Sequence, residues 1–334
     1  MLEDFLLLRK LSLRKLSNFI CLGLSYQLSR MLGKVIVWGQ PATLSIEPTN
    51  LCNLLCPECP VGAGNLSRSI GLMNMDLFKR IIEEIHQNLS YLIFYFQGEP
   101  YIHPEFFNMI RYAHVKKIFT MTSTNGQFLT NEMAKNTVQS GLDSLIISID
   151  GTTQEVYQQY RKGGELDKVI AGTRYLIEWK EKLKTKKPVI VFQFLVQRGN
   201  QHQIKDIKEL GKQLGVNKVS VKTIQICETK RDSPFLPTLS KYARYVRKEN
   251  GSLAIKNSLK NFCRRLWSAS VIMWDGVVVP CCFDKDGKYK MGNLNTDSFK
   301  YIWDGGKYTD FRNAILKNRK QFDICGNCTE GLQV

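Results

Sequence analysis

Three cysteines stand close together in residues 50–60, where Cys52, Cys56 and Cys59 are separated by three and then two residues. Thiolates at this spacing can curl around a cubane iron-sulfur cluster, in which each cysteine binds a different iron atom. Three protein ligands leave the fourth iron with an open position. An open position binds a reactant, whereas a filled shell only holds a fold together. The spacing therefore predicts a reactive 4Fe-4S centre.

Two simpler interpretations of these cysteines stay open at this point: a zinc site whose fourth ligand lies elsewhere, and buried thiols without a metal. Structural zinc sites favour two separated Cys-x-x-Cys pairs over three consecutive ligands in one loop. The loop also follows an apolar segment, residues 43–47, that ends at Pro48. A strand there delivers the cysteines to the carboxyl edge of an α/β barrel, where such folds place their sites.

Apolar segments of strand character alternate with amphipathic helical segments up to residue 226, as in parallel βα units. Helices are expected at 75–86 and 203–214, where the apolar residues form one stripe. The strands are expected at 43–47, 91–97, 118–122, 144–148, 189–196 and 219–226. Six such strands predict a partial (β/α)6 barrel.

Several polar residues and glycines come at the ends of these strands. Gly98 and Glu99 follow the second strand, Asn125 follows the third, and Ser148 and Asp150 stand at the end of the fourth. Parallel α/β sheets bind ligands at this edge, so these residues are candidates for cofactor binding. The alternative is that they only form turns and helix caps.

In these features the chain resembles the radical S-adenosylmethionine (SAM) family, whose signature is this cysteine spacing. Its Gly-Gly-Glu-Pro element and its next two strand ends are similar to residues 97–100, 124–126 and 148–151 of this chain. The resemblance implies a SAM-binding 4Fe-4S cluster held by Cys52, Cys56 and Cys59. It implies SAM contacts from Gly98, Glu99, Asn125, Ser148 and Asp150.

The same resemblance implies that SAM is cleaved reductively to a 5′-deoxyadenosyl radical, which removes a hydrogen atom from the substrate. A flavodoxin-type or ferredoxin-type protein is then the expected reductant. One residue departs from the family pattern, because many members carry an aromatic residue before the third cysteine and this chain has Glu58.

A second cysteine set follows near the end of the chain. The set consists of Cys263, Cys281, Cys325 and Cys328. Four thiolates are enough to bind all four iron atoms of a second 4Fe-4S cluster, and a zinc ribbon is the alternative. Asp275-Gly276 between two apolar runs predicts a hairpin that carries Cys281 back beside Cys263. The set resembles the SPASM or shortened "twitch" auxiliary-cluster domain, which implies a role in electron transfer or substrate anchoring. Cys282 is an alternative ligand, a hydrogen or proton donor, or a buried thiol.

These features together predict an α/β protein with a partial (β/α)6 radical SAM barrel and a small C-terminal α+β auxiliary-cluster domain. The expected segments are 1–40 (basic, helical), 41–227 (barrel), 228–262 (basic linker) and 263–334 (auxiliary cluster). The resemblance implies an oxidoreductase that dehydrogenates or otherwise modifies a small molecule. A peptide-modifying maturase is one alternative, disfavoured by the short segment before the barrel. A non-catalytic iron-sulfur electron carrier or sensor is the other.

Basic residues exceed acidic ones by a wide margin, 47 against 30, giving a net charge of +17. Residues 1–40 hold six basic and two acidic side chains among many leucines. They form either a helix on an anionic membrane surface or helices that close the bottom of the barrel with solvated charges.

Residues 228–265 hold ten basic and three acidic side chains, which favours an anionic substrate; no RNA or DNA module accompanies them, which disfavours nucleic acid. The ten cysteines cluster, and no cleavable leader is evident, so we expect a cytoplasmic protein, with peripheral membrane contact as an open possibility.

Overall fold

The computed structural model describes residues 2–227, 232–256 and 260–328. The chain divides into two compact units. Within the described residues, the first unit consists of 2–51, 67–121 and 260–328, and the second of 52–66, 122–227 and 232–256. Strand β3 (Phe119–Thr124) begins in the first unit and ends in the second.

The sheet of the first unit joins strands from both ends of the chain. Strands β1 (Thr43–Ile46), β2 (Tyr91–Ile93) and the start of β3 are parallel. On the other side of β1, β9 (Ala269–Ile272) pairs in parallel, followed by antiparallel β10 (Val277–Val279) and β11 (Gly292–Asn293). The hairpin expected at Asp275-Gly276 is therefore confirmed, and its turn has a φ of +84° at Gly276. The sequence did not predict that this hairpin would cover the free edge of β1.

Amphipathic helices cover this sheet. Helix α3 (Met75–Ile85) begins where the Asn74 side chain accepts hydrogen bonds from the N–H groups of Asp76 and Leu77. Its apolar stripe is buried as predicted. The other helices are α4 (Phe106–Val115), α9 (Arg265–Ser268), α10 (Phe299–Asp304) and α11 (Gly306–Asn318), with a short 3-10 turn at Pro100–Ile102.

Residues 1–40, where one or two helices were expected, contain α1 (Leu2–Leu8) and α2 (Leu13–Leu32). They meet the chain just before β3 begins: Lys10 Nζ donates to the Ile118 carbonyl at 2.9 Å and Lys15 Nζ to the Lys117 carbonyl at 2.6 Å. The expectation that their charges are only solvated is wrong for Lys15. The Lys15 side chain is buried and donates a hydrogen bond to a backbone carbonyl, and its burial lowers its pKa to about 8.

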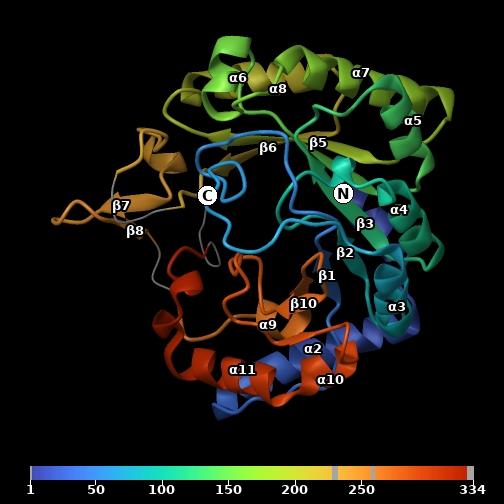
Figure 1. The fold of residues 1–334 in the computed structure, drawn as a ribbon, viewed down its shortest axis with the longest axis vertical. Coiled ribbons are helices and arrows are strands. Elements are labelled where there is room, and N and C mark those ends of the chain that lie inside the picture. The colour runs from blue at the N-terminus through green and yellow to red at the C-terminus, as the bar shows by residue number, and fades with distance from the viewer. Residues whose placement is uncertain (1, 228–231, 257–259, 329–334) are drawn as a thin grey trace. The chain divides into compact units, whose positions relative to one another are not determined.

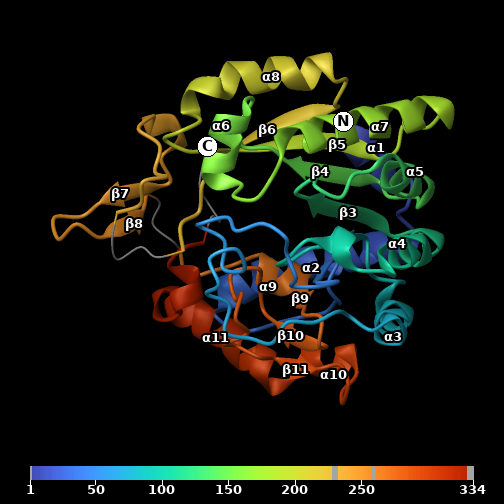
Figure 2. The ribbon, with the colours of Figure 1, turned by 45° about the horizontal axis from the view of Figure 1, so that its top comes forward.

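The second unit carries three parallel strands, β4 (Ser144–Ser148), β5 (Val189–Val196) and β6 (Lys218–Thr223). Figures 1 and 2 show helices lining the outer side of these strands. They are α5 (Asn131–Gln139), α6 (Gln154–Tyr160), α7 (Leu166–Lys182) and α8 (Ile204–Gln213).

Several predicted element boundaries need correction. The strand expected at 91–97 already ends at Ile93, and that expected at 219–226 is shifted to Lys218–Thr223. The expected basic linker contains an antiparallel hairpin, β7 (Tyr245–Arg247) and β8 (Leu253–Ile255), packed on Ile226 and Leu236. Lys230 and Arg231, part of the basic run, lie outside the described residues.

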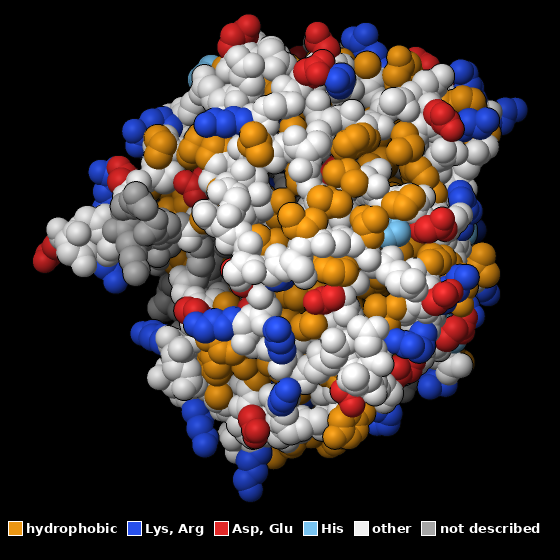
Figure 3. All heavy atoms as spheres, in the orientation of Figure 1, with side chains coloured by type: hydrophobic (Ala, Val, Ile, Leu, Met, Phe, Trp, Pro, Cys, Tyr) orange, Lys and Arg blue, Asp and Glu red, His pale blue; other side chains and the backbone are white. Residues whose placement is uncertain are grey.

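On the face drawn in Figure 3, the basic side chains of the described residues are scattered among acidic ones rather than gathered in one area. Among the described residues, no helix has the length and apolar character needed to cross a bilayer.

Candidate active site

The loop with the first three cysteines belongs to the second unit. Cys52, Cys56 and Cys59 all pack into one apolar cluster that contains Leu54 and Tyr160. The loop backbone is fixed from within, because Cys59 N–H donates to the Cys56 carbonyl at 3.1 Å. The Leu55 N–H also donates to the Lys162 carbonyl at 3.0 Å. The thiols are thus held in a semi-enclosed apolar setting.

Polar groups approach two of the three sulfur atoms. Asn125 Nδ2 lies 3.9 Å from Cys52 Sγ and donates to Asn53 Oδ1 at 2.8 Å. Arg161 Nη1 lies 3.9 Å from Cys56 Sγ. Burial raises the pKa of the Cys56 thiol, and the guanidinium charge opposes that shift. Hydrogen bonds and positive charge near thiolates stabilise the anionic form and tune iron-sulfur clusters.

The three thiols suit an iron-sulfur cluster by their chemistry. Thiolates are the soft ligands that hold such clusters, and nearby N–H donors tune them. Cys52, Cys56 and Cys59 supply three sulfur atoms in an apolar loop, and N–H groups of Asn125 and Arg161 lie near two of these sulfur atoms.

Asp150, predicted to bind the cofactor, lies at the end of β4 and is fully buried. Its Oδ2 accepts from Arg161 Nε at 2.6 Å, and its Oδ1 accepts from the Leu195 N–H at 2.7 Å. Burial raises the pKa of Asp150, while the Arg161 charge lowers it. Because both carboxylate oxygens already accept hydrogen bonds, Asp150 orients Arg161 toward Cys56. Ser148, also predicted, is buried in β4 opposite Gln193.

Sequence reasoning missed Arg161. The residue follows directly after α6, and a single arginine after a helix end gives only a weak signal. Its contact with the cysteine loop joins positions 105 residues apart, which no local pattern reveals.

Gly98 and Glu99, the remaining predicted cofactor residues, lie in the first unit beside the chain that leads into the cysteine loop. Gly98 has a φ of +75°, and a Cβ there would stand 2.6 Å from the carbonyl oxygens of Thr49 and Leu51. The Glu99 N–H donates to the Leu51 carbonyl at 2.7 Å. Leu51 directly precedes Cys52 in the chain, so this element fixes the backbone of the residue before the first cysteine.

Glu58, the departure from the family pattern, has a structural role in the second unit. Its carboxylate accepts from the Cys227 N–H at 2.8 Å and from Ser233 Oγ at 2.7 Å. The cysteine loop is therefore tied to the segment that follows β6.

A buried ion pair in the first unit was not predicted. Arg68 binds the fully buried Glu47 with two parallel hydrogen bonds of 2.6 and 2.5 Å, and donates from Nε to the Lys285 carbonyl at 2.7 Å. Burial raises the pKa of Glu47 despite the guanidinium. The pair connects the end of β1 to the loop after Cys282 and is a structural anchor.

The second cysteine set lies within the first unit. Cys263, Cys325 and Cys328 are buried, and burial also raises the pKa of Cys281. The buried Arg319 donates from Nη1 to the Phe262 carbonyl at 2.8 Å and from Nη2 to Cys328 Sγ at 3.3 Å. These bonds join the segments that carry the first and last cysteine of the set.

Cys282, left open by the sequence, is contacted by Arg265 Nη1 at 3.2 Å. A cavity of about 410 Å³ lies beside it, lined by Cys281, Cys282, Arg265, Tyr95 and Phe96 among others. This volume suits a small molecule or a compact inorganic cluster.

Comparison with known proteins agrees with this geometry. The radical SAM superfamily model matches residues 46–186, and the iron-sulfur cluster-binding SPASM model matches residues 263–329. Together the two models match more than half of the chain, and the chain belongs to the radical SAM superfamily. The domains imply a 4Fe-4S cluster with SAM and an auxiliary iron-sulfur centre.

The relatives are modifying enzymes. The chain is 28% identical over 322 residues to the tungsten-containing aldehyde ferredoxin oxidoreductase cofactor-modifying protein of Pyrococcus furiosus, with 86% of each chain covered. It is 29% identical over 184 residues to the AdoMet-dependent heme synthase of Methanosarcina barkeri, covering 54% of this chain and 50% of that protein.

Solved structures show the same fold. SuiB of Streptococcus suis bound to S-adenosylmethionine aligns with a TM-score of 0.63 at 16% identity, over 89% of this chain and 74% of that chain. BtrN in complex with AdoMet and 2-DOIA aligns with a TM-score of 0.53 at 17% identity, over 88% of this chain and 94% of that chain. The predicted family and fold class are confirmed.

Proposed function

We propose that this enzyme cleaves SAM reductively at a 4Fe-4S cluster bound by Cys52, Cys56 and Cys59, and uses the resulting radical to abstract hydrogen from a substrate. When bound, the cluster and SAM supply a 5′-deoxyadenosyl radical. The observation that carries this proposal is the apolar three-cysteine loop with Arg161 and Asn125 directed at its sulfur atoms.

The remaining predicted residues take separate roles. Gly98 and Glu99 hold the backbone at Leu51, the residue before Cys52, and are proposed as SAM contacts. Asn125 and Ser148 are proposed as further SAM contacts. Asp150 acts through Arg161, because its own carboxylate oxygens accept protein hydrogen bonds.

For the substrate we propose a small molecule, which the enzyme dehydrogenates or otherwise modifies. The relative that covers most of both chains modifies a cofactor, and the cavity beside Cys281 has a size suited to a small ligand. Cys263, Cys281, Cys325 and Cys328 are proposed to hold the auxiliary cluster. This cluster would accept the one electron that the substrate radical gives up after hydrogen abstraction, so that the two steps together oxidise the substrate by two electrons. The positive charge of the chain favours an anionic substrate.

The proposed setting is the cytoplasm, because the thiols must stay reduced to bind clusters. A flavodoxin-type or ferredoxin-type protein is the proposed reductant, and residues 1–40 are a proposed point of peripheral membrane contact. The segments 1–40, 41–227, 228–262 and 263–334 are retained as a functional division of the chain.

The test is anaerobic reconstitution with iron, sulfide, SAM and dithionite, followed by measurement of 5′-deoxyadenosine. The parent protein and Cys21→Ala are expected to form it, because Cys21 belongs to neither cysteine set. Cys56→Ala is expected to abolish it. Cys325→Ala is expected to lower total iron while SAM cleavage continues. Absence of 5′-deoxyadenosine with both clusters intact would favour a non-catalytic electron carrier.

A further inference from the structure

Helix α2 has its polarity reversed relative to an ordinary surface helix. Its buried residues are mainly polar or carry a polar tip: Lys15, Asn18, Leu22, Ser25, Tyr26 and Ser29. A surface helix normally buries its apolar stripe and exposes its polar one. The opposite arrangement here needs an explanation.

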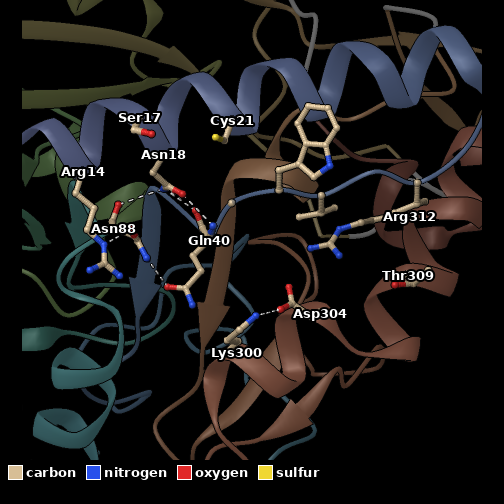
Figure 4. A pocket seen from close by; sticks show the side chains of 14 residues that line it. Arg14, Ser17, Asn18, Cys21, Gln40, Asn88, Lys300, Asp304, Thr309 and Arg312 are labelled. Atoms are coloured by element: carbon tan, nitrogen blue, oxygen red, sulfur yellow. Dashed lines mark hydrogen bonds and ion pairs between the residues drawn. The ribbon is translucent and has the colours of Figure 1, made fainter.

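The polar inner face is satisfied by hydrogen bonds to the segment after the helix. Asn18 exchanges two hydrogen bonds with the Gln40 backbone, at 2.8 and 3.0 Å. Ser25 Oγ accepts from the Trp38 N–H and Ser29 Oγ from the Ile36 N–H, each at 2.9 Å. Figure 4 shows Ser17, Asn18 and Cys21 extending from α2 toward a polar cavity that Arg312 also lines. The inner face therefore makes polar contacts, and these hydrogen bonds fix which side of α2 is buried.

The outer face of α2 forms what we call the apolar ridge: Leu13, Leu16, Ile20, Leu24 and Met31. These side chains are 86, 49, 56, 52 and 79% exposed, respectively. Their spacing of three, four, four and seven residues places them on one side of the helix. Phe5 and Leu8 of α1 are also more than half exposed. Exposed apolar surface of this continuity marks an interaction site.

Positive charge flanks the ridge, although α1 itself begins with Glu3 and Asp4. Arg14 and Arg30 are exposed on the two flanks of α2, where Arg14 also donates to Asn88 Oδ1 and Arg30 stacks on Phe262. Arg9 follows α1, and Lys34 follows α2. A second copy of this chain docked on the ridge by two-fold symmetry would bring like charges together. An anionic lipid surface complements both the apolar side chains and the cations.

We propose that the apolar ridge binds the surface of an anionic lipid membrane, with α2 lying in the plane of the interface. The ridge side chains enter the boundary between headgroups and acyl chains, and the flanking arginines and Lys34 contact lipid phosphates. This binding does not depend on the proposed radical chemistry, because it uses residues outside both cysteine sets.

The experiment is co-sedimentation of the reconstituted full-length protein with phosphatidylcholine vesicles that contain or lack phosphatidylglycerol. We expect binding only to the anionic vesicles. The variant Leu16→Asn/Ile20→Asn/Leu24→Asn is expected to bind more than about tenfold more weakly, because it removes the centre of the ridge. The variant Arg14→Gln/Lys34→Gln is expected to lose about 30-fold in partition coefficient and to show a weaker salt dependence.

The matched control is Val115→Ser/Tyr301→Ser, which removes two apolar side chains that are 77 and 70% exposed and lie outside the ridge. It is expected to bind like the parent protein. Formation of 5′-deoxyadenosine without vesicles, and the thermal unfolding midpoint, report whether each variant is folded. Equal binding of the ridge variant and the parent would overturn the proposal. A parent protein that does not bind either kind of vesicle would also overturn the proposal. Sedimentation equilibrium would then show whether the parent is a monomer or forms a dimer through the ridge, in which case the ridge variant would be monomeric.

Discussion

Arg161 donates from Nε to Oδ2 of Asp150 at 2.6 Å inside the second unit. The two side chains are only 12 and 0% exposed. The same guanidinium reaches Cys56 Sγ at 3.9 Å. The ion pair therefore fixes the position of the Arg161 guanidinium beside the cysteine loop. Water has little access to either side chain.

Removing one partner of this pair is expected to be costly, because the other charge then stays buried without compensation. Arg161→Met is expected to lower the free energy of unfolding by about 3–5 kcal/mol, measured by anaerobic urea denaturation. The double variant Arg161→Met/Asp150→Asn is expected to recover part of that loss. Lys168→Met serves as the control, because the Lys168–Glu165 pair is 55 and 62% exposed and exposed pairs contribute little. An equal effect of Arg161→Met and Lys168→Met would contradict the prediction.

Gly98→Ala is expected to weaken SAM binding by displacing the chain that enters the cysteine loop. The added Cβ would stand 2.6 Å from two carbonyl oxygens, so the backbone at residues 49–51 must move. Gly64→Ala is a close control, since its φ of +70° brings similar backbone strain while nothing lies within 4 Å of its Cβ position. Equilibrium binding of SAM to both reconstituted variants checks this. The prediction fails if Gly98→Ala and Gly64→Ala weaken the binding of SAM to the same extent.

Arg319→Gln is expected to shift the midpoint potential of the auxiliary cluster to more negative values. In the parent protein, the buried positive charge of Arg319 and its N–H donor at 3.3 Å from Cys328 Sγ both stabilise the reduced cluster. The substitution removes the charge and this hydrogen bond, so the cluster becomes harder to reduce. Lys320→Gln removes one positive charge at the next position, where the side chain is exposed. Redox titration followed by electron paramagnetic resonance measures the midpoints. A shift for Lys320→Gln as large as that for Arg319→Gln would show that the effect is not local.

The parts of the fold that were predicted are those that a local pattern encodes. The strand at Ser144–Ser148, the strand at Val189–Val196 and the apolar stripe of α3 follow from periodicity and turn residues alone. The cysteine spacing likewise indicated the cluster chemistry, because ligand spacing is itself local.

Long-range contacts were not predicted, because they join segments with no shared local signal. The pairing of β9 with β1, the Glu47–Arg68 ion pair and the contact of Arg161 with Cys56 each depend on the tertiary fold. The inverted face of α2 was missed for a related reason. Composition showed a basic, leucine-rich segment, but only the packing reveals which side of the helix is buried.

His103 is held in one neutral tautomer in the first unit. Its Nδ1 accepts from the Glu105 N–H at 3.1 Å, so the proton is on Nε2, which donates to the Met73 carbonyl at 2.9 Å. Burial lowers the pKa of His103 below its ordinary value of 6.5. Protonation of Nδ1 would remove the acceptor that the Glu105 N–H uses.

This environment predicts a loss of stability on acidification. The unfolded chain takes up a proton at His103 near pH 6.5, before the folded protein does, so protons favour unfolding in the interval between the two pKa values. The contribution of this group is therefore fully present above pH 6.5 and decreases as the pH falls toward the lower pKa of the folded state. His103→Gln keeps an N–H donor for the Met73 carbonyl and removes the titration, so urea midpoints measured between pH 7 and pH 5 should decline less steeply than those of the parent. His202→Gln, at an exposed position, is expected to follow the parent curve. If His103→Gln and the parent decline with the same slope, His103 does not contribute to the acid sensitivity of the fold.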